Sequence, residues 1–207
     1  MKVIANDQAP TADTQWQPGD LVAFWGRCWK SRVIEAATAG PSHVGIIANY
    51  GGRPTLFEST TLTNLQCVVR GRTIEGVQGH YVWDRIRSYD GHCRRVPISP
   101  AWRFSREESS LLSWALTQHW IGRPYNLKGA LLSGTRVFKW TRFMPYPDSG
   151  SLFCSELAAA ILMRFGRFPL DNPTRYHPAS LIRRARECGT YQRPEEIRGA
   201  AKTFAVM

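Results

Sequence analysis

Short runs of apolar and β-branched residues dominate the first half of the chain and predict β-strands. We expect strands over residues 21–25, 42–50, 55–62, 65–70 and 93–98. The turn cluster Gly51-Gly52-Arg53-Pro54 separates the second run from the third, so these two strands should form a hairpin. The segment between residues 71 and 92 is harder to assign. The middle of the chain is therefore predicted to be mostly antiparallel β-structure.

Helix-type spacing of apolar residues predominates in the second half of the chain. We expect helices over residues 105–120, 125–132, 153–164 and 178–187, in addition to an earlier one over residues 30–38. Ser105 and Glu108 form a capping-box pattern, and Ser151 should cap the helix that carries Cys154. Residues 135–150, rich in aromatic residues, proline and glycine, are predicted to form a long loop near the site. An antiparallel sheet packed against such helices is an α+β fold.

A chain of 207 residues suits one domain with a full hydrophobic core. Its 43% apolar content and eight tryptophans are typical of a globular protein. We expect residues 1–16 to be a flexible or partner-docking arm, residues 17–190 to be the domain, and residues 191–207 to be a C-terminal tail. No early apolar stretch is long enough for a signal peptide, and none approaches a membrane span. We therefore expect no export signal, no transmembrane segment, and a chain that is cytoplasmic as synthesised.

The net charge of +11 favours anionic surroundings such as nucleic acid, acidic lipid or a cell wall. No helix-turn-helix, zinc-finger or RNP-type motif accompanies the charge, so we expect a solvated basic surface and no specific nucleic-acid partner. The five cysteines, at positions 28, 67, 93, 154 and 188, form no Cys-x-x-Cys pair. This scatter predicts neither a disulfide framework nor a metal site, and we expect no cofactor.

The candidate chemistry rests on a histidine and a cysteine that each open a regular element. His43 begins an apolar, β-prone run, and Cys154 begins an Ala/Leu-rich helical run, where a helix N-terminus favours the thiolate. A thiol nucleophile needs a base, and the base needs a third group that orients it. Glu58 is the best third group, because an acid between apolar neighbours on the facing hairpin strand would be costly unless it were paired.

An oxyanion formed at Cys154 would also need donors. The backbone N–H of Cys154 is one candidate, and the hydroxyl of Tyr125, in Gly-Arg-Pro-Tyr, is a second. Each residue also has an ordinary structural interpretation. Taken alone, Cys154 would be a small buried hydrophobe, His43 a structural histidine, Glu58 a hairpin acid and Tyr125 a core residue. The four gain weight only as a set.

Two segments resemble a known family. Ile121-Gly-Arg-Pro-Tyr-Asn and Phe153-Cys-Ser-Glu-Leu are similar to the Gly-x-Pro-Tyr and Cys-Ser-x-Leu segments of NlpC-type cell-wall cysteine peptidases. Here the histidine lies far upstream of the cysteine, which resembles the circularly permuted branch, the YaeF- and YiiX-like papain-fold amidases. Lecithin:retinol acyltransferase-like enzymes are distant relatives of that branch. Phe153 departs from the pattern, since many NlpC-type enzymes have Asp before the cysteine.

The resemblance implies a papain-like core in which the nucleophile helix packs on an antiparallel sheet that carries the histidine. It also implies thiol-dependent cleavage at an amide or ester. The leading hypothesis is a bacterial or bacteriophage amidase or endopeptidase that cleaves peptidoglycan stem peptides, or acts on another anionic envelope substrate, carried there by a phage particle or secretion system. A thiol acyltransferase or lipid ester hydrolase is the close alternative. A structural phage-particle or secretion component is the alternative from another class.

Overall fold

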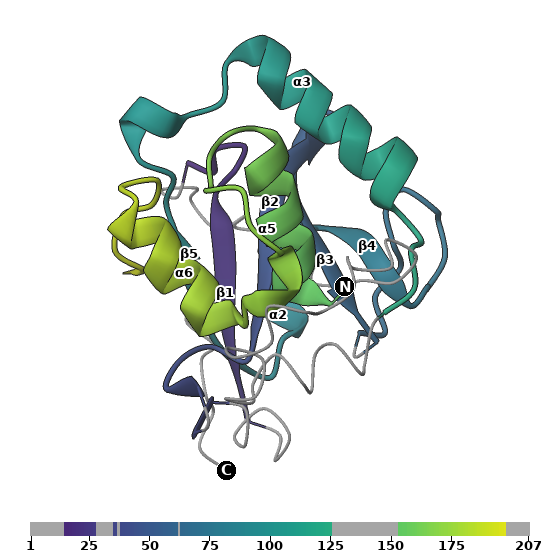
Figure 1. Cartoon of the computed structure of the whole chain (residues 1–207). Helices are drawn as coiled ribbons and strands as arrows, with labels where there is room; N and C mark the ends of the chain where they lie inside the picture. The colour runs from purple at the N-terminus through teal and green to yellow at the C-terminus, as the bar shows by residue number, and fades with distance from the viewer. Residues whose placement is uncertain (1–14, 28–34, 37, 62, 126–152, 198–207) are drawn as a thin grey trace, which may run out of the picture.

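The computed structural model describes residues 15–27, 35–36, 38–61, 63–125 and 153–197 of the chain. These residues form an α+β fold built on a six-stranded antiparallel sheet. In chain order, the sheet and its helices are β1 Leu21–Gly26, β2 His43–Tyr50, β3 Arg53–Thr60, β4 Gly76–Tyr81, α2 Val82–Ser88, β5 Gly91–Val96, α3 Arg106–Ala115, α5 Cys154–Arg164, α6 Pro178–Glu187 and β6 Glu195–Glu196. The strand order across the sheet is β4-β3-β2-β1-β5-β6 (Figure 1).

The predicted hairpin is confirmed. Strands β2 and β3 pair antiparallel, with Ile46 opposite Phe57, across a turn that contains Gly51 and Gly52. Both glycines have positive φ, 59° and 75°, a conformation that favours glycine because it has no Cβ. The hairpin fixes which residues of β2 and β3 share a face of the sheet.

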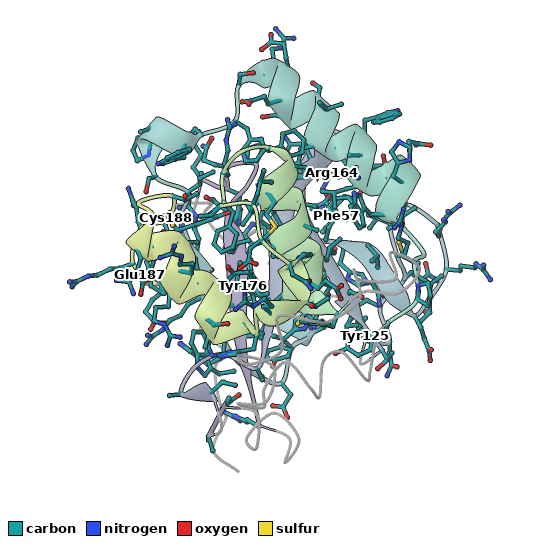
Figure 2. The ribbon with its side chains drawn as sticks, viewed as in Figure 1. Phe57, Tyr125, Arg164, Tyr176, Glu187 and Cys188 are labelled. Atoms are coloured by element: carbon teal, nitrogen blue, oxygen red, sulfur yellow. The ribbon has the colours of Figure 1, made fainter. Side chains whose placement is uncertain are left out.

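The two faces of the sheet bury different sets of side chains, because successive residues of a strand point to opposite sides. Val44 and Phe57 lie on the face covered by α3, α5 and α6. Ile47 and Leu56 lie on the other face, together with residues of α2. Figure 1 shows α5 and α6 crossing in front of the strands. Phe57, labelled in Figure 2, lies between the sheet and α5.

The helices expected over residues 105–120, 153–164 and 178–187 are present. The first is α3, which carries the predicted Ser105–Glu108 capping box and continues as a π-helical turn over Leu116–Trp120. The second is α5, which begins at Cys154 with Phe153 as its N-cap residue, so the prediction of Ser151 as the cap is wrong. The third is α6. Most of the expected 30–38 and 125–132 helices, the 135–150 loop and Ser151 lie outside the described residues.

The prediction of a strand over residues 65–70 is wrong. Cys67 makes an isolated bridge to Arg72, and the chain between them is a tight turn with Gly71 at φ 65°. Instead, the segment left unassigned contains both β4 and α2. These two elements complete the sheet beside β3 and cover its second face, so they matter directly for the surroundings of Glu58.

The packed part of the chain extends beyond the expected limits of the domain. Trp16 is buried and contacts Trp83 edge-on, with ring centroids 5.9 Å apart. Beyond residue 190, Tyr191 bridges Ile98, and β6 pairs with β5. The Tyr191 hydroxyl donates a hydrogen bond of 2.5 Å to the carbonyl of Gly19. Residues 191–197 therefore belong to the fold rather than to a tail. Within the described residues, no helix is long and apolar enough to cross a membrane.

Candidate active site

Cys154 lies at the N-terminus of α5, with only 4% of its surface exposed. The helix begins there because Phe153 has extended backbone angles and its N–H donates to the Glu156 carboxylate at 3.3 Å. Leu157, Ala158 and Ile161 then anchor the helix in the core. The sulfur accepts hydrogen bonds from the backbone N–H groups of Val44 and Ser155. Such donors favour a thiolate at this position.

His43 is the first residue of β2, and its imidazole joins the thiol to a carboxylate. The ring packs at a tilt against Phe24, with centroids 5.3 Å apart. Its Nε2 lies 2.6 Å from Oε2 of Glu58. The ring also hydrogen-bonds to Cys154, and because Nε2 faces Glu58, Nδ1 is the atom left for the sulfur. The structure therefore brings together Cys154, His43 and Glu58, the residues predicted to be nucleophile, base and orienting group, in that order.

The charges of His43 and Cys154 support each other. Burial disfavours the charged form of His43, but the neighbouring Cys154 thiolate and Glu58 outweigh it and raise the pKa of His43 to about 9. Burial likewise raises the pKa of Cys154, yet the His43 charge and the hydrogen bonds to the sulfur leave that pKa below its ordinary value. The physical consequence is a thiolate–imidazolium pair, the reactive state of a cysteine nucleophile.

Glu58 is fully buried in β3 and accepts hydrogen bonds from three side chains. Besides His43, His80 Nδ1 of β4 lies 3.1 Å from Oε1. Arg85 of α2 reaches both oxygens, with Nε 2.5 Å from Oε1 and Nη2 3.1 Å from Oε2. Burial raises the pKa of Glu58, but the Arg85 charge and the two histidines hold it well below its usual range. The carboxylate is therefore ionised and fixed in position.

His80 and Arg85 are the residues of this cluster that the sequence did not point to. Both lie in the segment that the hydrophobic pattern left unassigned. The available signal was Glu58 itself, since a buried carboxylate needs a compensating positive charge. Nothing in the local sequence indicates which arginine provides it, because Arg85 lies 27 residues from Glu58.

Tyr125 lies near the thiol, at the end of a segment that runs alongside β4. The N–H of Gly122 donates to the carbonyl of Val77 at 2.7 Å, and the N–H of Val77 donates to the carbonyl of Arg123 at 2.8 Å. Burial and the Cys154 charge both raise the pKa of Tyr125, so its hydroxyl stays protonated and can donate a hydrogen bond. Figure 2 shows Tyr125 at the end of the sheet where α5 begins.

Gly76 makes this approach possible. Its φ is 87°, and a Cβ built on it would lie 1.9 Å from the Arg123 carbonyl oxygen. No L-residue fits between β4 and the segment that carries Tyr125 without moving one of them.

The other described cysteines lie elsewhere. Cys67 and Cys93 are buried and Cys188 is partly exposed, and none is disulfide-bonded. Cys28 lies outside the described residues. Among the residues that the structure covers, no group of three or more His, Cys, Asp or Glu side chains is placed to hold a metal ion.

Comparisons with known proteins support the fold rather than a sequence relationship. No protein-family model matches the chain, and no curated protein matches its sequence. Among solved structures, it is similar to the crystal structure of metalloprotein YiiX (DUF1105) from Escherichia coli O157:H7. The TM-score is 0.50 and the sequence identity 20%, over 73% of this chain and 67% of the YiiX chain. The chain has a papain-like α+β fold.

The predicted YiiX-like fold is thus confirmed. Membership of the permuted NlpC branch and a relationship to lecithin:retinol acyltransferase-like enzymes remain predictions, because a likeness at 20% identity shows the fold alone. The description as a metalloprotein belongs to YiiX and is not carried over to this chain.

Proposed function

We propose that this protein is a cysteine hydrolase that cleaves amide bonds through an acyl-enzyme at Cys154. The observation that carries the proposal is the buried thiol at the start of α5, hydrogen-bonded to His43, whose Nε2 lies 2.6 Å from Glu58. Nucleophile, base and orienting acid in this order are the arrangement that thiol hydrolases use on several folds.

In the proposed reaction, the Cys154 thiolate attacks the substrate carbonyl carbon and forms a tetrahedral oxyanion. N–H groups of the first turn of α5 and the Tyr125 hydroxyl are the candidate donors to that oxygen. The C–N bond then breaks as the His43 imidazolium gives its proton to the leaving amine. Water next attacks the thioester while His43 accepts its proton, and the carboxylic acid product and free thiolate result. Glu58 holds the His43 ring throughout.

For the substrate, we propose stem peptides of peptidoglycan or another anionic envelope polymer. The net charge of +11 supports an anionic partner. An open cleft of about 560 Å³ is lined by Arg70 and Arg72 and by Ile121 and Gly122, which lead to Tyr125; Glu75 also lines it. A positively charged cleft beside the segment that carries Tyr125 suits a substrate with carboxylate groups. Delivery by a phage particle or secretion system remains part of this proposal.

The test is digestion of purified peptidoglycan by the wild-type protein, Cys154→Ala and Cys188→Ala, with released fragments identified by mass spectrometry. We expect new amine and carboxyl ends in the stem peptide with the wild type and with Cys188→Ala, and none with Cys154→Ala. Cys188→Ala is the matched control because Cys188 follows the end of α6, away from Tyr125 and the start of α5 (Figure 2). Equal release by Cys154→Ala would refute the nucleophile assignment. If the walls stay intact while acyl esters are hydrolysed, the substrate is an ester rather than an amide.

A further inference from the structure

The orienting carboxylate of the site has a complete set of hydrogen-bond partners. A carboxylate can accept about four hydrogen bonds. Glu58 receives four: at Oε1 from Arg85 Nε and His80 Nδ1, and at Oε2 from His43 Nε2 and Arg85 Nη2. Arg85 therefore binds with two parallel hydrogen bonds, the geometry that fixes a carboxylate most firmly. Any rotation of the Glu58 side chain away from His43 would break both.

Arg85 is itself held in place. Only 5% of its side chain is exposed. The guanidinium lies 5.0 Å above the Phe24 ring and 5.1 Å from the Tyr89 ring. The Phe24 ring also contacts His43, at 5.3 Å between centroids. Helix α2 thus positions the Arg85 guanidinium against Glu58, on the face of the sheet opposite α5.

The buried charges of the site balance in two pairs. Arg85 compensates Glu58, and the His43 imidazolium compensates the Cys154 thiolate. Without Arg85, the same buried cluster would carry a net negative charge, which is unfavourable in a desolvated site. The cluster would relieve that charge by taking up a proton at Glu58 or Cys154. Either event weakens the proposed nucleophile, through loss of the orienting carboxylate or through loss of the thiolate.

We propose that Arg85 is a positioning and charge-balancing residue of the active site, which keeps Glu58 ionised against His43 and so maintains the Cys154 thiolate at neutral pH. His80 completes the hold on Glu58 from β4. This inference rests on the proposed function, because it concerns how the same thiol is activated. Arg85 acts through Glu58 and does not contact the sulfur in the hydrogen bonds described above.

Other ionisable groups face this cluster, and they stay in place when Arg85 alone is replaced. They come from the elements packed around it: His43 of β2, Glu58 of β3, His80 of β4, Tyr89 after α2, Cys93 of β5, and Cys154 of α5 with Tyr125 beside it. Only Arg85 among the residues named in this cluster carries a permanent positive charge. Its removal is therefore a clean change of one buried charge.

The experiment measures the rate of Cys154 alkylation by iodoacetamide across about pH 5–9, a range that spans the ordinary histidine and cysteine pKa values. The labelled peptide is quantified by mass spectrometry in the wild type, Arg85→Met, Arg85→Lys, Glu58→Gln and the double variant Glu58→Gln/Arg85→Met. Arg95→Met is the matched control. Arg95 also pairs with a fully buried acid, with Nε 2.8 Å from Oδ2 of Asp20, and also lies over an aromatic ring, that of Trp16.

We expect Arg85→Met to move the acid limb of the alkylation profile upward by about 1 pH unit, the lower end of the effect of one adjacent opposite charge, because Arg85 acts on the thiol through Glu58. Below that limb, the alkylation rate should fall by about tenfold for every pH unit that the limb moves. Arg85→Lys keeps the positive charge and should stay near the wild-type profile, although it loses the bidentate hydrogen bonds to Glu58. In Glu58→Gln the orienting carboxylate is already absent, so the double variant should have its limb where Glu58→Gln alone has it, because Arg85 acts through Glu58.

Two results would overturn the inference while leaving the proposed function intact. One is an acid limb that Arg85→Met leaves unmoved in a protein whose wild-type Cys154 reacts as a thiolate near neutral pH. The other is an equal movement of the limb in Arg95→Met, which would show that the shift comes from the general loss of stability when a buried ion pair is removed. A wild-type Cys154 that reacts no faster than Cys188 would instead refute the proposed function itself. Circular dichroism of each variant confirms that the measured protein is folded.

Discussion

Substitution of Gly76 by alanine tests how the fold brings Tyr125 to the thiol. Gly76 has φ 87°, and its missing Cβ would lie 1.9 Å from the Arg123 carbonyl oxygen and 2.9 Å from the Arg123 carbonyl carbon. Both neighbours are backbone atoms, so they cannot rotate away as a side chain could. Alanine must displace the segment that carries Tyr125 from the edge of β4.

The magnitude follows from the contacts that are lost. Alanine at positive φ costs about 1–2 kcal/mol. Displacement also breaks the Gly122 to Val77 and Val77 to Arg123 hydrogen bonds, each worth about 1 kcal/mol. Together these effects should lower the free energy of unfolding by about 3–4 kcal/mol. The hydrolysis rate should fall as well, because the Tyr125 hydroxyl moves away from Cys154.

Gly52→Ala is the matched control. Gly52 has φ 75°, close to that of Gly76, but nothing lies within 4 Å of its would-be Cβ. Its free energy of unfolding should fall only by the backbone cost of about 1–2 kcal/mol, and it should retain full activity. Urea denaturation of the two variants measures the difference directly. Equal unfolding free energies for Gly76→Ala and Gly52→Ala would refute the reasoning, since the close approach to Arg123 would then cost nothing.

Three further predictions concern the site and its helix. Hydrolysis should decline as the pH rises through the His43 pKa of about 9, because the leaving amine then lacks its proton donor, whereas alkylation of Cys154 should not decline there; parallel pH profiles of the two rates check this, and a common decline would contradict it. Burial raises the pKa of Glu156 to about 7, so between about pH 4.5 and 7 the folded state holds a proton that the unfolded state has lost, and the free energy of unfolding should fall as the pH rises through that window. Glu156→Gln should remove roughly 2–3 kcal/mol of that fall, measured by urea denaturation at each end of the range. An unchanged pH dependence would argue against a buried acid. Phe57→Ala empties the space between the sheet and α5 and should cost about 3–5 kcal/mol in urea denaturation, against less than about 0.5 kcal/mol for the exposed Trp114→Ala; similar losses in the two would refute the packing described for Phe57.

The sequence was informative where the signals are local. The hairpin of β2 and β3 could be predicted because its Gly-Gly turn lies between two β-prone runs, and this hairpin places His43 and Glu58 together. The start of α5 could be predicted from its apolar helical run. In each case the residues that determine the structure are neighbours in the chain.

The unpredicted parts depend on distant contacts. Strand β4, Gly-Val-Gln-Gly-His-Tyr, has two glycines and a buried histidine in place of apolar alternation. Helix α2 has seven residues, too few to show a period. Both are stabilised by packing against β3, which no local pattern reveals. Strand β6 is likewise two glutamates that pair with Arg94 and Arg95 of the edge strand β5. Arg85 and His80 escaped prediction for this reason.

The central claim, that His43 activates Cys154 as a nucleophile, is tested most directly by the pH dependence of Cys154 alkylation in the wild type and in His43→Ala. The account predicts a fast-reacting thiolate in the wild type at pH values below the ordinary thiol pKa of 9.0. In His43→Ala the acid limb should move up toward that value, because the imidazolium that stabilises the thiolate is gone. Identical profiles for the two proteins would contradict the claim.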